Sequence, residues 1–190
     1  MIYLLEGEFA GRRLQHQLAR RILTYGLQEE YGIRGEPAVE VTPLGKPYLS
    51  EYPQIHFNYS HCSRGILCGI SHHAIGVDIE GFRPCEERLV SRICHANEQR
   101  MVLDAQDRDR ALAVIWTAKE SYLKYLGTGI RSDLRRLDLS SAIRDQARIG
   151  DACIHSILEE EYAIGICCDS PSITIHRLCI REGKLTLDIL

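Results

Sequence analysis

Apolar residues recur at helical spacing in two long stretches of the chain. The first stretch predicts a helix from Arg12 to about Tyr31, in which Gly26 weakens the pattern near the end. The second predicts helical structure from about Pro84 to Leu126, and its last part has the clearest apolar stripe. That stripe consists of Leu112, Ile115, Trp116, Tyr122, Leu123 and Leu126. A glycine, at 127 or 129, is expected to end the helix.

Shorter apolar runs on either side of these stretches predict strands. They cover residues 2–5, 55–60, 65–71, 74–80, 152–158, 162–168, 172–180 and 184–190. The runs at 55–60 and 65–71 are separated by a short polar segment, which is typical of a hairpin. Strands followed by helices and then by strands again favour an α+β fold with antiparallel sheets.

The composition is that of an ordinary soluble globular protein. Of 190 residues, 45% are hydrophobic and 26% are charged, and the formal net charge is −3. This charge gives no global reason to expect nucleic acid as a partner. No apolar run approaches the roughly 20 residues that span a bilayer, and the start of the chain lacks the basic region of a signal peptide. We therefore expect a cytoplasmic protein without a nucleic-acid or membrane partner.

Eight cysteines are present, and none of them forms a Cys-x-x-Cys pair. Several lie in apolar, strand-like runs. Without a secretion signal they are interpreted as reduced cysteines of the core.

Two acids lie in the predicted strand "AIGVDIE". Asp78 and Glu80 share one face of the strand with Gly76, and they are about 7 Å apart. Two carboxylates at this spacing can converge on one Mg²⁺, and the glycine would leave room for a ligand. The other interpretation is a solvent-facing edge strand that ends in charged residues.

The long helix and a turn supply further candidates. Glu120 and Lys124 are one helical turn apart, so they form either a surface ion pair or a carboxylate and a lysine of a phosphoryl-transfer site. Lys46 lies in a "GKP" turn, where a lysine is either solvated or available to a ligand. In "FNYSHC", Ser60 and His61 interrupt an apolar strand. Because neighbouring strand residues point to opposite faces, these two do not suit a nucleophile and its base.

The order "GKPY…FNYSHC…GVDIE…WTAKESYLK", from about residue 44 to 125, resembles the surfactin-type 4′-phosphopantetheinyl transferases. The resemblance implies a pseudo-dimer of two similar α+β halves, each with a long helix, and coenzyme A in the cleft between them. The expected halves are residues 1–74 and 75–190. The implied reaction transfers phosphopantetheine from coenzyme A to a serine of an acyl, polyketide or peptidyl carrier protein and releases adenosine 3′,5′-bisphosphate.

The resemblance also implies roles for individual residues. Asp78, Glu80 and Glu120 match the acids that bind Mg²⁺, for which Mn²⁺ is an alternative. Lys124 matches a lysine that contacts the pyrophosphate, and Glu120 is either metal ligand, base or both. The residues that match contacts to coenzyme A are Lys46, Ser60 and His61. Lys119 matches a motif lysine without an assigned catalytic role.

The N-terminal part departs from the family pattern, because the first strand leads almost directly into the helix. Candidates to hold the 3′-phosphate of coenzyme A are Arg12, Arg13, His16, Arg20 and Arg21, and Arg13 is preferred. Arg83, Arg88, Arg92 and Arg100 form either a docking surface for an acidic carrier protein or an ordinary amphipathic face.

Three functions are therefore compared. The leading one is a Mg²⁺-dependent phosphopantetheinyl transferase of fatty-acid, polyketide or nonribosomal-peptide biosynthesis. The alternatives are a Mg²⁺-dependent hydrolase of coenzyme A and a catalytically silent protein that binds carrier proteins. Since a pseudo-dimer needs no partner subunit, a monomer is expected.

Overall fold

The structure is a computed structural model, and it describes residues 1–129, 133–144 and 146–188. Its helices are α1 (Arg12–Tyr31), α2 (Glu87–Ile93), α3 (Ala96–Leu103) and α4 (Arg108–Leu126), with two short 3-10 helices, η1 (Leu134–Arg136) and η2 (Ser140–Arg144). The strands of the first half are β1 (Ile2–Glu6), β2 (Val39–Val41), β3 (Pro47–Leu49), β4 (His56–His61) and β5 (Gly65–Ser71). The later strands are β6 (Gly76–Gly81), β7 (Gln146–Ile149), β8 (Ala152–Leu158), β9 (Tyr162–Cys168), β10 (Ile175–Arg181) and β11 (Lys184–Leu187). The predicted helix at 12–31 and the predicted hairpin at 55–71 are confirmed.

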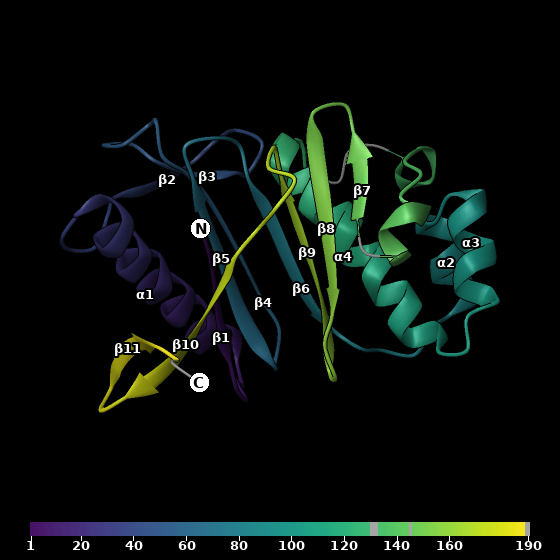
Figure 1. The fold of residues 1–190 in the computed structure, drawn as a ribbon, viewed down its shortest axis with the longest axis horizontal. Helices are drawn as coiled ribbons and strands as arrows, with labels where there is room; N and C mark the ends of the chain where they lie inside the picture. The colour runs from purple at the N-terminus through teal and green to yellow at the C-terminus, as the bar shows by residue number, and fades with distance from the viewer. Residues whose placement is uncertain (130–132, 145, 189–190) are drawn as a thin grey trace.

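Two sheets lie back to back between two long helices (Figure 1). The first sheet has the order β11-β10-β1-β5-β4 and is covered by α1, and the second has the order β6-β9-β8-β7 and packs on α4. Strands β2 and β3 form a separate two-stranded ribbon. Each half is thus one sheet with one long helix, which confirms the α+β class and the two-half architecture.

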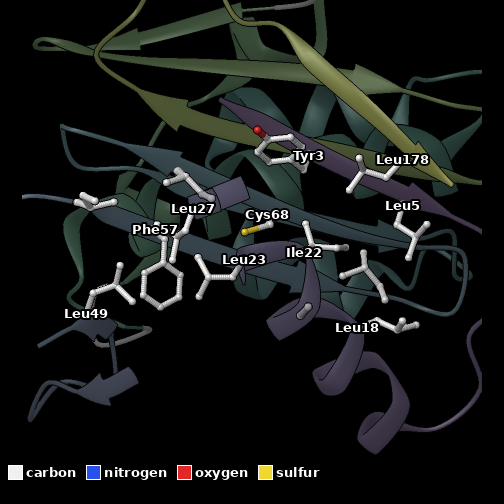
Figure 2. Packing of buried hydrophobic residues seen from close by; sticks show 14 residues of the cluster. Tyr3, Leu5, Leu18, Ile22, Leu23, Leu27, Leu49, Phe57, Cys68 and Leu178 are labelled. Carbon is white, nitrogen blue, oxygen red and sulfur yellow. The ribbon is translucent and has the colours of Figure 1, made fainter. Parts of the chain in front are cut away.

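The core of the first half fills the space between α1 and its sheet (Figure 2). The apolar side chains of α1 meet Tyr3 and Leu5 of β1 and Phe57 of β4. Gly26 strengthens this packing, because a Cβ atom there would lie 2.6 Å from Tyr3 and from Ile70. Helix α1 therefore continues past Gly26 to Tyr31.

A second apolar layer joins the two sheets. Ile2 and Leu4 of β1 and Leu67 of β5 face Val77 and Ile79 of β6. The period of two predicted for β6 is confirmed, since Val77 and Ile79 point to the first sheet while Asp78 points to the opposite face.

Helix α4 is buried on more sides than its predicted stripe implies. One face lies on β6, β8 and β9, and another face packs on α2 and α3. Thr117 and Ser121 are therefore fully buried, whereas Leu126 is 48% exposed. The predicted stripe is therefore confirmed at Leu112, Ile115 and Leu123 and wrong at Leu126, and the second buried face was not predicted.

Two glycines let α4 approach the second sheet closely. A Cβ atom on Gly76 would lie 2.0 Å from the Ser121 carbonyl oxygen, and one on Gly165 would lie 2.2 Å from that of Thr117. The expectation that Gly76 leaves room for a ligand was therefore wrong, because the backbone of α4 occupies that space.

The last two strands return to the first sheet, although the predicted second half, 75–190, includes them. Strand β10 pairs with β1 in parallel, with Ile2 opposite Ile175, and β11 pairs with β10. The other ladders described by the structure are antiparallel. As folding units, 1–74 and 75–190 remain a prediction, but the sheets are not divided at that boundary.

All eight cysteines carry free thiols, and five of them are buried, as the core interpretation requires. Within the described part of the chain, no helix has the length and apolar character needed to cross a membrane.

Candidate active site

Strand β4, strand β6 and helix α4 meet at Asp78. The Asp78 Oδ1 atom accepts hydrogen bonds from Ser60 Oγ of β4 at 2.7 Å and from Lys124 Nζ of α4 at 2.6 Å. Lys124 also donates to the Val77 carbonyl oxygen at 3.1 Å. Asn58 fixes the junction of the two sheets, because its Oδ1 accepts from the Val77 backbone amide at 2.9 Å. The solvent-facing interpretation of Asp78 was wrong, since the residue is only 6% exposed.

Two more carboxylates complete an acidic group around Asp78. Burial, and then the negative charges of Asp78 and Glu80, raise the pKa of Glu120, although Lys124 opposes the shift. Burial raises the pKa of Glu80 as well, while Arg83 and Lys124 oppose the shift. The negative charge of Asp78 thus raises the pKa of both glutamates, and Lys124 and Arg83 offset it only in part.

This group fits a hard divalent cation by the chemistry of its donors. Asp78 Oδ2 and Glu120 Oε1 are buried oxygen atoms without a hydrogen-bond partner. A buried carboxylate oxygen is costly unless it is paired, and Mg²⁺ takes oxygen ligands of this kind. Among the described residues, no three histidine, cysteine, aspartate or glutamate side chains lie close enough together to hold a metal ion. The fit to a divalent cation therefore rests on the two carboxylate oxygens without a hydrogen-bond partner and on the repulsion between the negative charges of the acids.

A cleft of about 340 Å³ opens beside the acids. Lys46 of the "GKP" turn, Asn58 of β4, and Glu120 and Lys124 of α4 are among its lining residues. Lys46 donates from Nζ to the Tyr125 carbonyl oxygen at 2.9 Å, so it is not a solvated turn lysine. Burial lowers the pKa of Lys46. Residues that are far apart in the sequence thus meet around one cavity.

Ser60 and His61 point to opposite faces of β4, as expected. Ser60 contacts Asp78, whereas the His61 ring meets the His16 ring of α1 edge-on, with centroids 4.8 Å apart. Burial, and then the positive charges of His16, Lys124 and Arg12, lower the pKa of His61. A basic group therefore lies where α1 begins, next to the end of β4.

The other basic residues of α1 have different surroundings. Arg13, the preferred candidate for the 3′-phosphate, is exposed on α1. Arg20 pairs with Glu36 at 2.6 Å, and Arg21 donates to the Gly183 carbonyl oxygen at 2.5 Å. Of the N-terminal candidates, Arg12 and His16 are the two that influence His61.

Comparisons with known proteins match this site. The family model of the 4′-phosphopantetheinyl transferase superfamily matches residues 74–167, which include Asp78, Glu80, Glu120 and Lys124. Sfp of Bacillus subtilis strain 168, a 4′-phosphopantetheinyl transferase, is 34% identical over 45% of this chain and 39% of its own length. The chain belongs to the 4′-phosphopantetheinyl transferase superfamily. The resemblance to surfactin-type members is thereby confirmed.

Other relatives of this superfamily extend the match. A 4′-phosphopantetheinyl transferase of Bacillus subtilis is 29% identical over 69% of this chain and 62% of its own length. The 4′-phosphopantetheinyl transferase psf-1 of Bacillus pumilus is 25% identical over 84% of this chain and 72% of its own length. The match spans 62% of the first of these relatives and only 39% of Sfp. The solved structure of the holo-[acyl-carrier-protein] synthase of Thermotoga maritima matches 50% of this chain and 61% of its own length at 18% sequence identity. The TM-score of this match, 0.38, is too low to assign a fold.

In this phosphopantetheinyl transferase homologue, Lys119 lies away from the site. Its fully buried ammonium group pairs with Glu98 at 2.8 Å and donates to the carbonyl oxygens of Leu134 and Leu137 at 2.7 and 2.6 Å. Glu98 also accepts from the amides of His95 and Leu139. Lys119 therefore joins α4 to α3 and to the segment that contains η1.

The structure shows a contact between Glu80 and Arg83 that was not predicted from the sequence. The sequence left Arg83 open between a docking surface and an ordinary amphipathic face, and in the structure its guanidinium lies 3.5 Å from Glu80 Oε1 and 5.2 Å from the centre of the Trp116 ring. Arg88 and Arg92 of α2 are exposed, which both interpretations require. The i and i+3 spacing of Glu80 and Arg83 was the available signal, but it indicates a contact only once the turn after β6 is known.

Proposed function

We propose that this protein is a 4′-phosphopantetheinyl transferase that moves phosphopantetheine from coenzyme A to a serine hydroxyl of an apo carrier protein and releases adenosine 3′,5′-bisphosphate. The supporting observation is the group formed by Asp78, Glu120 and Lys124 beside a cleft, in a chain of this superfamily. The unpaired carboxylate oxygens and the adjacent ammonium group suit a pyrophosphate held with a divalent cation.

Asp78, Glu80 and Glu120 would hold Mg²⁺, or Mn²⁺ in its place. When bound, the ion would supply positive charge that offsets the charge of the pyrophosphate. Lys124 would contact the pyrophosphate and stabilise the leaving phosphate, for which its position next to Asp78 is suitable. Ser60 would keep Asp78 in place through the hydrogen bond to Oδ1.

Glu120 would also accept the proton of the attacking serine. Its Oε1 is buried without a hydrogen-bond partner, so a lone pair is free to accept the proton. The serine belongs to the carrier protein, so Ser60 is not the nucleophile. The roles of ligand and of base are both retained for Glu120.

The 3′-phosphate of coenzyme A would lie against the basic group at the start of α1. His61 and His16 contact each other at this place, the positive charge of Arg12 acts on His61, and the free N–H groups of a helix start add to the positive potential. Arg13, which the sequence preferred, is not among the charges that act on His61, so we favour Arg12 over it. Lys46 lines the cleft in which the rest of coenzyme A would lie.

An acyl, polyketide or peptidyl carrier protein would dock beside Glu80 on the exposed arginines of α2. Opposite charge would orient an acidic carrier and speed its association. Because both halves of the cleft come from one chain, a cytoplasmic monomer suffices for this activity.

Intact-mass measurement of an apo carrier protein after incubation with coenzyme A and Mg²⁺ tests the proposal. The carrier should gain the mass of one phosphopantetheine group, and adenosine 3′,5′-bisphosphate should appear in equal amount. Release of the bisphosphate without a carrier would instead indicate hydrolysis of coenzyme A. An unmodified carrier and intact coenzyme A, with several carrier classes tried, would indicate a silent binding protein.

A further inference from the structure

The lysine of the "GKP" turn donates to the last turn of α4. Its Nζ lies 2.9 Å from the Tyr125 carbonyl oxygen, across 79 residues of sequence. The last four carbonyls of an α-helix have no amide partner within the helix, and a cation is favourable at that end. The ammonium group of Lys46 therefore satisfies a carbonyl that the helix itself leaves free.

The backbone that carries Lys46 is fixed on its own side. Its amide donates to Thr42 Oγ1 at 3.0 Å, and its carbonyl accepts from the Thr42 amide at 2.9 Å. Gly45 also donates to the Thr42 carbonyl at 2.9 Å. The turn between β2 and β3 thus presents the lysine from a closed loop.

The aliphatic stem of the Lys46 side chain lies against the C-terminal end of α4. Gly127 ends the helix at a φ of 70°, and a Cβ atom there would lie 2.9 Å from Cδ of Lys46. The glycine suits this position by its backbone conformation, and a larger residue would also crowd the stem of Lys46.

We propose that Lys46 is a positioning residue, which fixes the last turn of α4 and thereby the placement of Lys124 against Asp78. Lys124 directly precedes Tyr125, whose carbonyl is held, and its Nζ contacts Asp78 at 2.6 Å. The link also joins the β2–β3 ribbon of the first half to the helix of the second half at the cleft. The activity part of this inference rests on the proposed function, whereas the structural part does not.

Hydrogen exchange in the protein without coenzyme A tests the structural part. Lys46→Met keeps most of the stem and removes the donor, so the amides of residues 123–127 should exchange about 10- to 100-fold faster, as expected for loss of a charge-assisted hydrogen bond. Residues 28–32 at the end of α1 should be unchanged. Lys184→Met, at an exposed lysine, is the matched control and should change neither region.

Kinetics then separate positioning from direct contact with coenzyme A. Positioning predicts that Lys46→Met lowers kcat and leaves the KM for coenzyme A near the wild-type value. Unchanged exchange at residues 123–127 together with a raised KM would overturn the proposal. If the wild-type protein transferred no phosphopantetheine, the proposed function would fail while the exchange result still decided the role of Lys46.

A pair of glycines provides a second test, should Lys46→Met not fold. Gly127 and Gly32 end their helices with nearly equal φ values, 70° and 67°, but a Cβ atom on Gly32 would meet nothing within 4 Å. Gly127→Ala should therefore lower the melting temperature more than Gly32→Ala does. The excess should vanish in a Lys46→Ala background, and equal effects in both backgrounds would contradict the placement of the stem.

Discussion

Replacement of Lys119 by methionine should destabilise the protein without disabling its chemistry. The ammonium group is fully buried and has three oxygen partners, one of which is the fully buried Glu98 carboxylate. Methionine fills a similar volume but leaves that carboxylate without its counter-charge. Two backbone amides would still donate to Glu98, so the loss concerns the charge and the two freed carbonyls.

The magnitude follows from the burial of the pair. Breaking a buried ion pair by removing one partner costs about 3–5 kcal/mol. For a chain of this size, 1 kcal/mol corresponds to about 2–4 °C, so Lys119→Met should lower the melting temperature by about 6–20 °C. Combining it with Glu98→Gln removes the stranded charge, so the double variant should lose less than the sum of the two single variants.

Thermal unfolding followed by circular dichroism, with transfer assayed well below the melting temperature, checks both parts. The folded variant should keep a kcat within a few-fold of wild type, because Lys119 touches α3 and η1 rather than the cleft. Lys184→Met should stay within about 0.5 kcal/mol of wild type. A Lys119→Met variant with normal stability and a thousand-fold loss of transfer would refute the reasoning.

Three further outcomes are expected. Because burial raises the pKa of Glu120 above its ordinary value of 4.5, the metal-free protein should lose stability as the pH rises from that value towards the raised pKa. Glu120→Gln should therefore melt higher than wild type at neutral pH while losing transfer, and a lower melting point would contradict this. Gly76→Ala should cost about 3 kcal/mol or more by pushing α4 off the sheet, whereas Gly150→Ala, with open space around it, should cost only about 1–2 kcal/mol, as denaturant titration would show. Arg12→Gln should raise the KM for coenzyme A but not the KM for 3′-dephospho-coenzyme A, and Arg13→Gln should change neither KM. If Arg13→Gln rather than Arg12→Gln raised the KM for coenzyme A, the 3′-phosphate contact would belong to Arg13.

The elements with a strong period were predictable from the sequence. Helix α1 and the strands β4, β5, β6, β8 and β9 lie where apolar spacing places them, because their packing needs one clear face, whereas β7 was not predicted. The order of the four motifs also predicted that Asp78, Glu120 and Lys124 belong together. For these residues, local pattern and tertiary packing agree.

Features that depend on long-range pairing were not predictable in this way. The parallel pairing of β10 with β1 joins residues far apart in the chain, and nothing in the local pattern of β10 indicates its partner. Gly76 looked like space for a ligand because the strand alone does not show that α4 crosses it. Lys46 looked like a solvated or ligand-binding lysine for the same reason, since its partner lies on another element.

The most direct test of the account is the mass of an apo carrier protein after incubation with coenzyme A and Mg²⁺, in the presence of wild-type protein or of Asp78→Asn. The account predicts that wild-type protein adds one phosphopantetheine group to the carrier and that Asp78→Asn, folded to the same extent, adds it at least about 100-fold more slowly, the loss expected when a catalytic charge contact is removed. Equal rates for the two proteins, or a carrier left unmodified by the wild type, would contradict it.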